Sequence, residues 1–472
     1  MSGTPLDWIS APAGPLRGVL RVPGDKSISH RSIMLAAIAE GTSHISGFLE
    51  GEDTRATARA FAQMGVRIEA PSSNERIVHG VGLHGLHAAR AGADSCTLSD
   101  DFADRARRDG ASINTQLVGA HASAENVGLI DCGNAGTGMR LLTGLLAGQQ
   151  FDSTLIGDES LSRRPMRRVI EPLTQMGARI EAQPGGLPPL RVGHSSALNG
   201  IDYSLPVASA QVKSAILLAG LYAAGETVVR EPNPTRDYTE RMLATFGWPI
   251  QFGAGWAKLT GNHRLQATDI IVPSDFSSAA FFIVAATTVP GSDLLLQSVG
   301  MNPRRTGLLR ALRAMGADVL EIDAREVGGE PVADLRVRAA DLHGIDVPSD
   351  VVPDMIDEFP ALFVAAAAAS GSTRISGAAE LRVKESDRIA VMGTGLRTLG
   401  IAFDESPDGA IITGGTIAAG SVDSRGDHRC AMSFAIAGLL ASGPVRIRDC
   451  ANVATSFPGF VELACSSGFD LR

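Results

Sequence analysis

One phrase recurs six times along the 472 residues and constrains the fold more than any other feature of the sequence. A helix-like segment ends in a glycine and a short strand-like segment follows at once, as in residues 61–68 and 173–180. Each glycine takes the position just after a helix, where the left-handed backbone conformation strongly favours glycine. The six marker glycines are Gly65, Gly177, Gly247, Gly316, Gly400 and Gly468.

The spacing of the marker glycines indicates a large repeat. Successive markers lie 112, 70, 69, 84 and 68 residues apart. A repeat of about 70 residues with strands and a helix is larger than most solenoid repeats. A second shared element, a turn followed by a short β-branched strand, stands at residues 41–46, 225–229, 371–375 and 443–447. Because the chain is too long for one core, the pattern predicts an α/β (α+β) fold with three repeats in each of two lobes.

The long first interval contains an insertion at about residues 88–126. This segment is rich in Ala, Asp, Arg, Ser and Gly and has little apolar content. Such a composition is typical of an exposed excursion, in this case with room for one short helix.

Charge and composition exclude several classes of protein. The net charge of −9 argues against a general nucleic-acid or anionic-membrane surface. The five cysteines are scattered without a C-x-x-C pair, which disfavours a disulfide framework and a structural zinc site. The N-terminal segment does not resemble a signal peptide, and the longest apolar stretch is too short to span a bilayer. We therefore expect a cytoplasmic protein.

Lysine is rare in this chain, which makes its positions informative. Only Lys26, Lys213, Lys258 and Lys384 stand among 42 basic residues. A compact ammonium group cannot be exchanged for a planar guanidinium where its position matters. Lys258 is expected to be an ordinary surface residue. The other three lie in polar clusters, at residues 24–31, 209–214 and 382–388, where we expect the chemistry.

Four more segments complete the set of chemically suggestive clusters. They are the glycine-rich residues 131–140, the arginine-rich residues 162–168, the acidic residues 352–360 and residues 426–429. The first polar cluster is expected to precede a helix over residues 33–40, so that Lys26, Ser27 and Arg31 converge near its N-terminus, a natural anion site. Taken singly, each charge run is more often a solvated face. Together they indicate a cleft for two anions, with acids available for proton transfer.

Residues 24–31, 133–137, 382–388 and 426–429 resemble the signatures of the 3-phosphoshikimate 1-carboxyvinyltransferase (EPSP synthase) family. The resemblance runs from about residue 15 to the C-terminus, apart from the insertion. It implies a two-lobed, inside-out α/β barrel of six βαβαββ repeats, with the active site between the lobes. The chain would cross between lobes twice, which places residues 1–24 with 272–472 in one lobe and 25–271 in the other.

The same resemblance implies an activity. The family transfers the enolpyruvyl group of phosphoenolpyruvate to the 5-hydroxyl of 3-phosphoshikimate and releases phosphate, a step of the shikimate pathway to aromatic amino acids. The reaction is an addition–elimination through a tetrahedral intermediate, so one group must protonate the methylene carbon and another must deprotonate the hydroxyl. No metal or organic cofactor is implied. We expect a monomer with small-molecule partners and no nucleic acid or membrane.

Site residues follow by position from the family motifs. Asp354 resembles the general base, Glu385 the proton-transfer partner, and Lys26 a contact to both substrates. The positions that match phosphoenolpyruvate contacts are Lys26, Asn134, Gly136, Arg164, Gln211, Arg388 and Arg429. The positions that match phosphoshikimate contacts are Lys26, Ser27, Arg31, Ser209, Ala210, Gln211, Arg236, Asp354 and Lys384.

Two departures from the common family pattern stand out. Thr455 occupies a position where many members carry a lysine that contacts phosphoenolpyruvate. Ala210 and Lys213 resemble a divergent subgroup, some of whose members tolerate the inhibitor glyphosate. Gly136, however, is alanine in the tolerant members, so this chain is expected to be a glyphosate target.

Two other functions have less support in the sequence. The related enolpyruvyl transferase that acts on UDP-N-acetylglucosamine shares the fold, but it typically has a cysteine in a mobile loop and lacks the phrase at residues 28–31. A DNA clamp-like ring of six units would need a basic inner stripe, which the net charge of −9 opposes.

Overall fold

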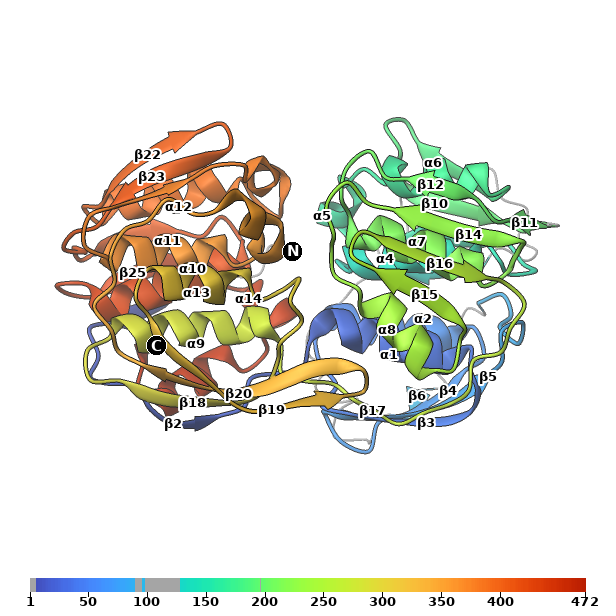
Figure 1. Ribbon diagram of the computed structural model, residues 1–472, viewed down its shortest axis with the longest axis horizontal. Coiled ribbons are helices and arrows are strands. Elements are labelled where there is room, and N and C mark those ends of the chain that lie inside the picture. The colour runs from blue at the N-terminus through green and yellow to red at the C-terminus, as the bar shows by residue number, and fades with distance from the viewer. Residues whose placement is uncertain (1–5, 90–95, 98–127, 196) are drawn as a thin grey trace. The chain divides into compact units, whose positions relative to one another are not determined.

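The chain folds into two compact units. The computed structural model describes residues 6–89, 96–97, 128–195 and 197–472 (Figure 1). Unit 1 comprises Met1–Asp25 and Pro273–Arg472, and unit 2 comprises Lys26–Val272. The chain therefore passes between units twice, at points that differ by one residue from the boundaries given by the family resemblance. Most of the expected insertion at residues 88–126 lies outside the described residues.

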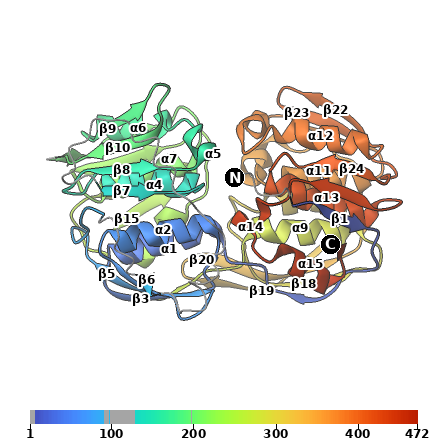
Figure 2. The same ribbon diagram turned by 180° about the vertical axis from the view of Figure 1, so that it is seen from behind.

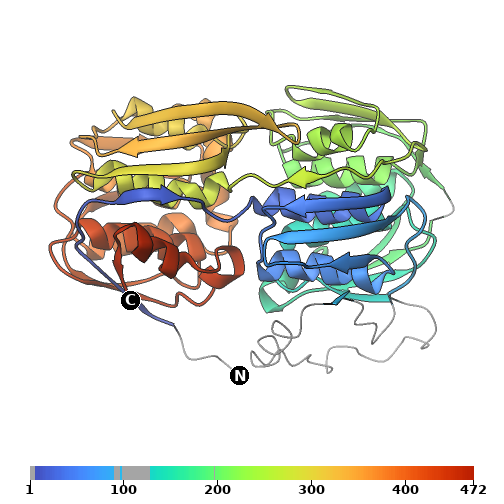
Figure 3. The same ribbon diagram turned by 90° about the horizontal axis from the view of Figure 1, so that it is seen from below.

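Three sheets form the outer layers of unit 1. The N-terminal segment contributes a strand to two of them, because β1 pairs with β25 and β26 while β2 runs parallel to β18 (Figures 2 and 3). The sheets, in strand order, are β24 (Gly420–Asp423), β25 (Val445–Arg448), β1 (Trp8–Ala11), β26 (Asp470–Leu471); β19 (Asp318–Val327), β20 (Glu330–Arg338), β18 (Asp293–Gly300), β2 (Arg17–Leu20); and β21 (Ser372–Ile375), β23 (Gly409–Thr413), β22 (Ala402–Ser406).

Apolar helices fill the centre of unit 1. Along α9 (Phe276–Thr288), α11 (Phe359–Ala368) and α13 (His428–Leu440), nearly every residue is buried. A helix that is apolar on all sides belongs in the interior. Figure 1 shows these helices between the outer sheets, the inside-out arrangement that the resemblance implied. The second helix of each repeat is α10 (Gly307–Ala314), α12 (Arg388–Thr398) or α15 (Phe460–Ser467).

Unit 2 repeats this architecture with its own buried core. The longer helices among its described residues are α1 (Lys26–Ala37), α2 (Glu52–Gln63), α4 (Gly136–Leu146), α6 (Arg167–Gln175), α7 (Ala210–Gly220) and α8 (Tyr238–Thr245). Its larger sheets are β17 (Ile270–Ile271), β3 (Glu40–Ser46), β5 (Glu75–Val81), β4 (Arg67–Glu69), β6 (Cys96–Thr97); β7 (Gly128–Asp131), β8 (Ser153–Ile156), β10 (Leu187–Gly193), β9 (Arg179–Gln183); and β12 (Asp202–Ser204), β14 (Glu226–Arg230), β16 (Trp256–Thr260), β15 (Ile250–Gly253). A short pair, β11 (Leu198–Asn199) and β13 (Ala223–Ala224), completes the unit.

The repeat predicted from the marker glycines is confirmed. Each marker follows α2, α6, α8, α10, α12 or α15, and its φ lies between 80° and 116°. The four expected β-branched strands are β3, β14, β21 and β25. In unit 2 as in unit 1, three repeats share one core.

One helix boundary was predicted wrongly. The sequence placed the first polar cluster ahead of a helix at residues 33–40, but α1 begins at Lys26 and ends at Ala37. Buried hydrogen bonds override the poor helix propensity of this segment; the Ser29 hydroxyl, for example, accepts the N–H of Leu49 at 3.0 Å. The cluster therefore forms the first turns of the helix. In the described part of the chain, no helix is long and apolar enough to cross a membrane.

Candidate active site

Arg31 joins three helices of unit 2. It is 4% exposed, and its Nε donates to Thr239 Oγ1 of α8 at 2.7 Å. Its Nη2 donates to Ser214 Oγ of α7 at 2.9 Å, and its Nη1 donates to the carbonyl of Ser27 at 2.9 Å. These contacts fix a cation beside the first turn of α1.

Lys26 stands at the first position of α1. Its Nζ lies 3.1 Å from Asp53 Oδ2 on α2, and the lysine side chain is 26% exposed. One helical turn later, His30 is fully buried and its Nδ1 lies 2.8 Å from Thr57 Oγ1. Burial lowers the pKa of His30 to about 3, so the imidazole is neutral at physiological pH. The ammonium group of Lys26 is thus accessible, while the helical turn that carries it is held by buried contacts.

The start of α7 carries the second polar cluster. Ser209 is the N-cap, and its hydroxyl accepts the N–H of Val212 at 3.4 Å. Gln211 Oε1 accepts from Arg140 Nη1 at 2.8 Å, and Gln211 Nε2 donates to Thr137 Oγ1 at 2.9 Å. Gln211 therefore links the starts of α7 and α4. Ala210 is the first helical residue beside it, and Arg236 is half-buried just before α8.

The glycine-rich segment begins α4 at Gly136. Arg164, just after α5 (Glu159–Ser162), donates from Nη2 to Asn134 Oδ1 at 3.1 Å. A Cβ atom added to Gly136 would lie 3.1 Å from Arg164 Nη1 and 3.2 Å from Arg140 Nη1. Glycine thus leaves room beside two guanidinium groups.

In unit 1, Asp354 lies in the short 3-10 helix η2 (Ser349–Met355). The residue is 6% exposed, and its Oδ2 lies 3.3 Å from Arg304 Nη1. Burial raises the pKa of Asp354 above its ordinary value, although Arg304 and Arg310 act against the increase. Asp354 is therefore a carboxylate with increased proton affinity.

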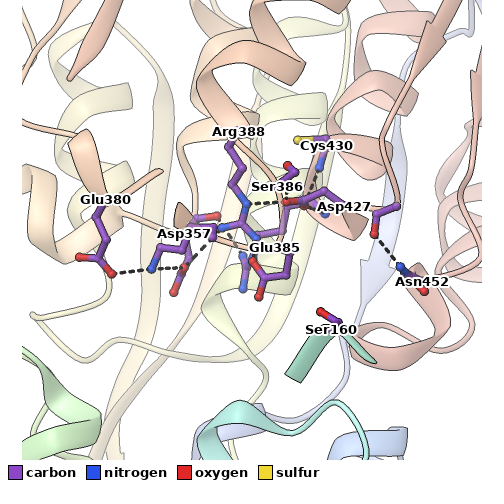
Figure 4. A network of polar contacts seen from close by, with 12 residues as sticks. Ser160, Asp357, Glu380, Glu385, Ser386, Arg388, Asp427, Cys430 and Asn452 are labelled. Carbon is purple, nitrogen blue, oxygen red and sulfur yellow. Dashed lines mark hydrogen bonds and ion pairs between the residues drawn. The ribbon is translucent and has the colours of Figure 1, made fainter. Parts of the chain in front are cut away.

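Arg388, the first residue of α12, is the centre of a buried network (Figure 4). It is 1% exposed; its Nε donates to Asp427 Oδ2 at 2.9 Å and its Nη2 donates to Glu385 Oε2 at 2.6 Å. Asp427 is also the N-cap of α13, and it accepts from the Ser386 hydroxyl at 3.0 Å. Burial alone would raise the pKa of Asp427, but the charges of Arg388 and then His428 hold it below its ordinary value.

Several cations lie next to Asp357, which follows η2, and Arg305 is one of them, with its Nη1 3.7 Å from Asp357 Oδ2. Lys384 Nζ lies 3.5 Å from Asp357 Oδ1 and 2.8 Å from Glu380 Oε1. Arg388 Nη1 lies 3.6 Å from the same Asp357 oxygen, and Arg429 Nη1 donates to the Asp357 carbonyl at 3.1 Å. Asp357 thus joins the residue 382–388 cluster to the start of α13.

In unit 1 these contacts join Lys384, Glu385, Arg388 and Arg429. Asp354 contacts Arg304 instead. In unit 2 they join Gln211 to the start of α4 and Arg164 to Asn134.

The structure also shows partners that the sequence did not indicate. The sequence marks Asp357 only as part of an acidic run, and it gives no indication that Asp53, Arg304 or Arg305 contact site residues. They lie far along the chain from the residues they contact, and no local pattern distinguishes them from surface charges.

Lys213 and Thr455 are not part of these networks. Lys213 Nζ lies 2.8 Å from both Glu231 Oε2 and Glu240 Oε1, and the lysine is 3% exposed. The expectation that its cluster marks chemistry is therefore wrong for Lys213 itself, which is a buried structural cation. Thr455, in α14 (Val453–Ser456), donates its hydroxyl to the Asn452 carbonyl at 2.7 Å. Lys258 pairs with Glu226 at 2.6 Å on half-exposed strands.

The comparisons with known proteins agree with these motifs. The family model described as EPSP synthase (3-phosphoshikimate 1-carboxyvinyltransferase) matches residues 11–95 and 105–463. The chain belongs to this family. As an EPSP synthase family member it is an enzyme, a transferase of the enolpyruvyl group in the shikimate pathway.

Relatives cover the full length. The 3-phosphoshikimate 1-carboxyvinyltransferases of Xanthomonas campestris pv. campestris (strain B100) and Xanthomonas oryzae pv. oryzae (strain PXO99A) are each 61% identical, over 100% of this chain and 99% of theirs. The solved EPSP synthase of Acinetobacter baumannii superimposes with a TM-score of 0.85 at 48% identity, over 99% of this chain and 100% of that one. The enolpyruvyl transferase NikO of Streptomyces tendae, at 17% identity and a TM-score of 0.73 over 100% of this chain and 99% of that one, shares the fold.

Proposed function

We propose that the chain transfers the enolpyruvyl group of phosphoenolpyruvate to the 5-hydroxyl of 3-phosphoshikimate with the residues described above. One observation carries this assignment: four helices begin at an expected site residue, and a fifth, α13, carries Arg429 as its second residue. These are α1, α4 and α7 in unit 2 and α12 and α13 in unit 1. Backbone N–H groups and the helix dipole favour negative charge at such positions, and both substrates are anions.

Asp354 acts as the general base. Its raised proton affinity suits a group that accepts the proton of the 5-hydroxyl as the oxygen attacks carbon 2 of phosphoenolpyruvate. The methylene carbon takes up a proton in the same addition. The resulting tetrahedral intermediate then loses a methyl proton and phosphate, which restores the double bond.

Glu385 is the proton-transfer partner of the methylene carbon of phosphoenolpyruvate. Its side chain is 33% exposed, so it exchanges protons with solvent while Arg388 Nη2 orients it at 2.6 Å. Lys384 and Lys26 supply ammonium groups for the charge that develops on the substrates. Neither role needs a metal or an organic cofactor.

Binding is divided between arginine-rich and hydroxyl-rich positions. Arg388 and Arg429 in unit 1 and Arg164, Asn134 and Gly136 in unit 2 hold phosphoenolpyruvate. Guanidinium groups match carboxylate and phosphate geometry, which supports this choice. Phosphoshikimate is held by Ser27, Arg31, Ser209, Ala210, Gln211, Arg236 and Lys384.

We further propose that the enzyme belongs to the divergent subgroup, acts as a monomer and works in the cytoplasm. Ala210, Lys213 and Thr455 support the subgroup. The proposed roles draw on residues of a single chain, which supports the monomer. Sedimentation equilibrium at working concentration tests it, and a dimer mass contradicts it.

A phosphate-release assay tests the proposed function. Wild type should release phosphate only when both substrates are present, and Asp354→Asn should lose at least about 10²-fold in kcat. Asp346→Asn is the control, because Asp346 pairs with Arg374 at the surface of the same unit, and it should stay within a few-fold. Full activity of Asp354→Asn, or equal release with UDP-N-acetylglucosamine, contradicts the assignment.

A further inference from the structure

The loop between β18 and α10 contains two arginines to which the sequence gave no role. Arg304 Nη1 lies 3.3 Å from Asp354 Oδ2, so the loop contacts the proposed general base directly. The Arg304 side chain is 36% exposed, whereas that of Asp354 is 6% exposed. A half-exposed cation therefore covers a nearly buried carboxylate.

The backbone of Arg304 is held in place from one side. Its N–H donates to Asn302 Oδ1 at 3.0 Å. Asn302 is 2% exposed and donates from Nδ2 to Glu330 Oε2 at 3.0 Å, at the first residue of β20. Buried hydrogen bonds of this kind restrict the loop to one conformation.

The next residue anchors the loop from the other side. Arg305 is 4% exposed, and its Nη2 donates to Asp275 Oδ1 at 2.9 Å and to Ser277 Oγ at 2.7 Å. Both acceptors belong to the start of α9, Asp275 as its N-cap. Arg304 thus extends its side chain from a backbone fixed at two points.

Gly307 brings this loop close to the backbone of Asp354. A Cβ atom at Gly307 would lie 2.8 Å from the Val351 carbonyl oxygen and 3.1 Å from the Asp354 carbonyl carbon. No side chain fits there without displacing η2. The start of α10 therefore packs directly on the segment that carries Asp354.

We propose that Arg304 is a positioning residue for Asp354, which it holds by one carboxylate oxygen so that the other faces the substrate hydroxyl. This inference rests on the proposed function of Asp354 as base. Besides Arg304, the charged groups that act on Asp354 are Arg310 and Asp350, and these two pair with each other at 2.8 Å. Arg304 is thus the cation in contact with the base, and its charge opposes the larger effect of burial on the pKa of Asp354.

The pH dependence of kcat follows from this arrangement. Asp354 must be ionised to accept a proton, and a neighbouring cation favours the ionised form. Removing the cation raises the pKa, so the acidic limb of the profile should move to higher pH. For one Asp–Arg contact, half exposed, we expect a shift of about one pH unit.

Four variants test the inference through pH profiles of kcat. In Arg304→Met the acidic limb should rise by about one unit and the plateau should fall about tenfold. Arg304→Lys keeps the charge, so the acidic limb of its pH profile should stay close to that of wild type. Its plateau kcat should lie between those of wild type and Arg304→Met. Arg313→Met, whose arginine lies in α10 and pairs with Glu321 of β19, should match wild type. Asp354→Asn reports on the base itself.

The outcomes distinguish a wrong role for Arg304 from a wrong assignment of Asp354 as the base. If Asp354→Asn retains wild-type turnover, the proposed base is wrong and the role of Arg304 falls with it. If Asp354→Asn is inactive but the acidic limb of Arg304→Met superimposes on that of wild type, only the positioning role is overturned. Equal limb shifts in Arg304→Met and Arg304→Lys also overturn it, because the charge then has no part in the effect.

Discussion

Lys26 and Asp53 form an ion pair, with Nζ of the lysine 3.1 Å from Oδ2 of the aspartate, that ties the first residue of α1 to α2. The aspartate side chain is 10% exposed and the lysine side chain 26%. The pair therefore fixes the direction of an ammonium group that a ligand can still reach. A guanidinium at this position would be larger and would engage the aspartate with a fork of donors instead of one point charge.

We expect Lys26→Arg to lose at least about 10²-fold in kcat, the scale for a displaced electrostatic contact. Lys258→Arg is the control, since that lysine pairs with Glu226 on half-exposed strands and should keep its turnover. Steady-state kinetics of both variants, with circular dichroism to check folding, make the comparison. Near-normal turnover of folded Lys26→Arg contradicts the role given to the ammonium.

Because residue 136 is glycine, we expect the enzyme to be sensitive to glyphosate, which resembles phosphoenolpyruvate in charge but is longer. An alanine Cβ would stand 3.1 Å from Arg164 Nη1, in the space beside the proposed phosphoenolpyruvate ligands. Gly136→Ala should therefore weaken glyphosate far more than phosphoenolpyruvate, because a clash built against one ligand creates specificity. Inhibition of wild type and variant at matched phosphoenolpyruvate measures this. A wild type as tolerant as the variant refutes the steric account and points to Thr455.

Because Lys213 is buried between two carboxylates, we expect its substitution to lower stability and not turnover. Burial alone would lower its pKa, but Glu240 and Glu231 raise it, so the ammonium stays charged between two carboxylates. Lys213→Met should lower the free energy of unfolding by about 3–5 kcal/mol, because it leaves carboxylates buried without their cation. Lys258→Met should change it by less than about 0.5 kcal/mol. Urea denaturation measures both; equal stabilities contradict the buried-cation role.

His30 predicts a pH-dependent stability. Its pKa is about 3 in the folded chain, whereas an unfolded histidine titrates near pH ~6.5. Below pH ~6.5 the unfolded state therefore binds a proton at His30 that the folded state does not bind. The contribution of the neutral imidazole to stability is present above pH ~6.5 and is lost as the pH falls.

The His30 contribution should fall by about 1.4 kcal/mol between pH ~8 and ~5.5. The difference in unfolding free energy between wild type and His30→Asn should shrink by this amount over that range. A constant difference for His30→Asn would mean that folding does not lower the pKa of the imidazole, which contradicts its buried, neutral state.

The fold was predictable because its signal is local. A glycine such as Gly65 must adopt a φ of 97° immediately after a helix, so the residue type itself records the end of each repeat. The start of α1 was not predictable in this way. There the helix is imposed by buried tertiary hydrogen bonds to Ser29 and Arg31, which no propensity contains.

The motif residues could be found from their spacing, but their partners could not. Glu385 and Arg388 are three residues apart and form an ion pair between the loop before α12 and the first residue of that helix. Arg304 and Asp354 are 50 residues apart and meet only because Gly307 lets α10 lie against η2. Contacts of this second kind follow from packing, and a single sequence does not display them.

The most direct test of the account is the identity of the product. Purified chain is mixed with 3-phosphoshikimate and phosphoenolpyruvate, and the products are followed by ³¹P nuclear magnetic resonance and mass spectrometry. The account predicts phosphate and the 5-enolpyruvyl ether in equal amounts, with neither formed when one substrate is omitted. Phosphate without the ether, or the ether formed on a hydroxyl other than the 5-hydroxyl, would contradict it.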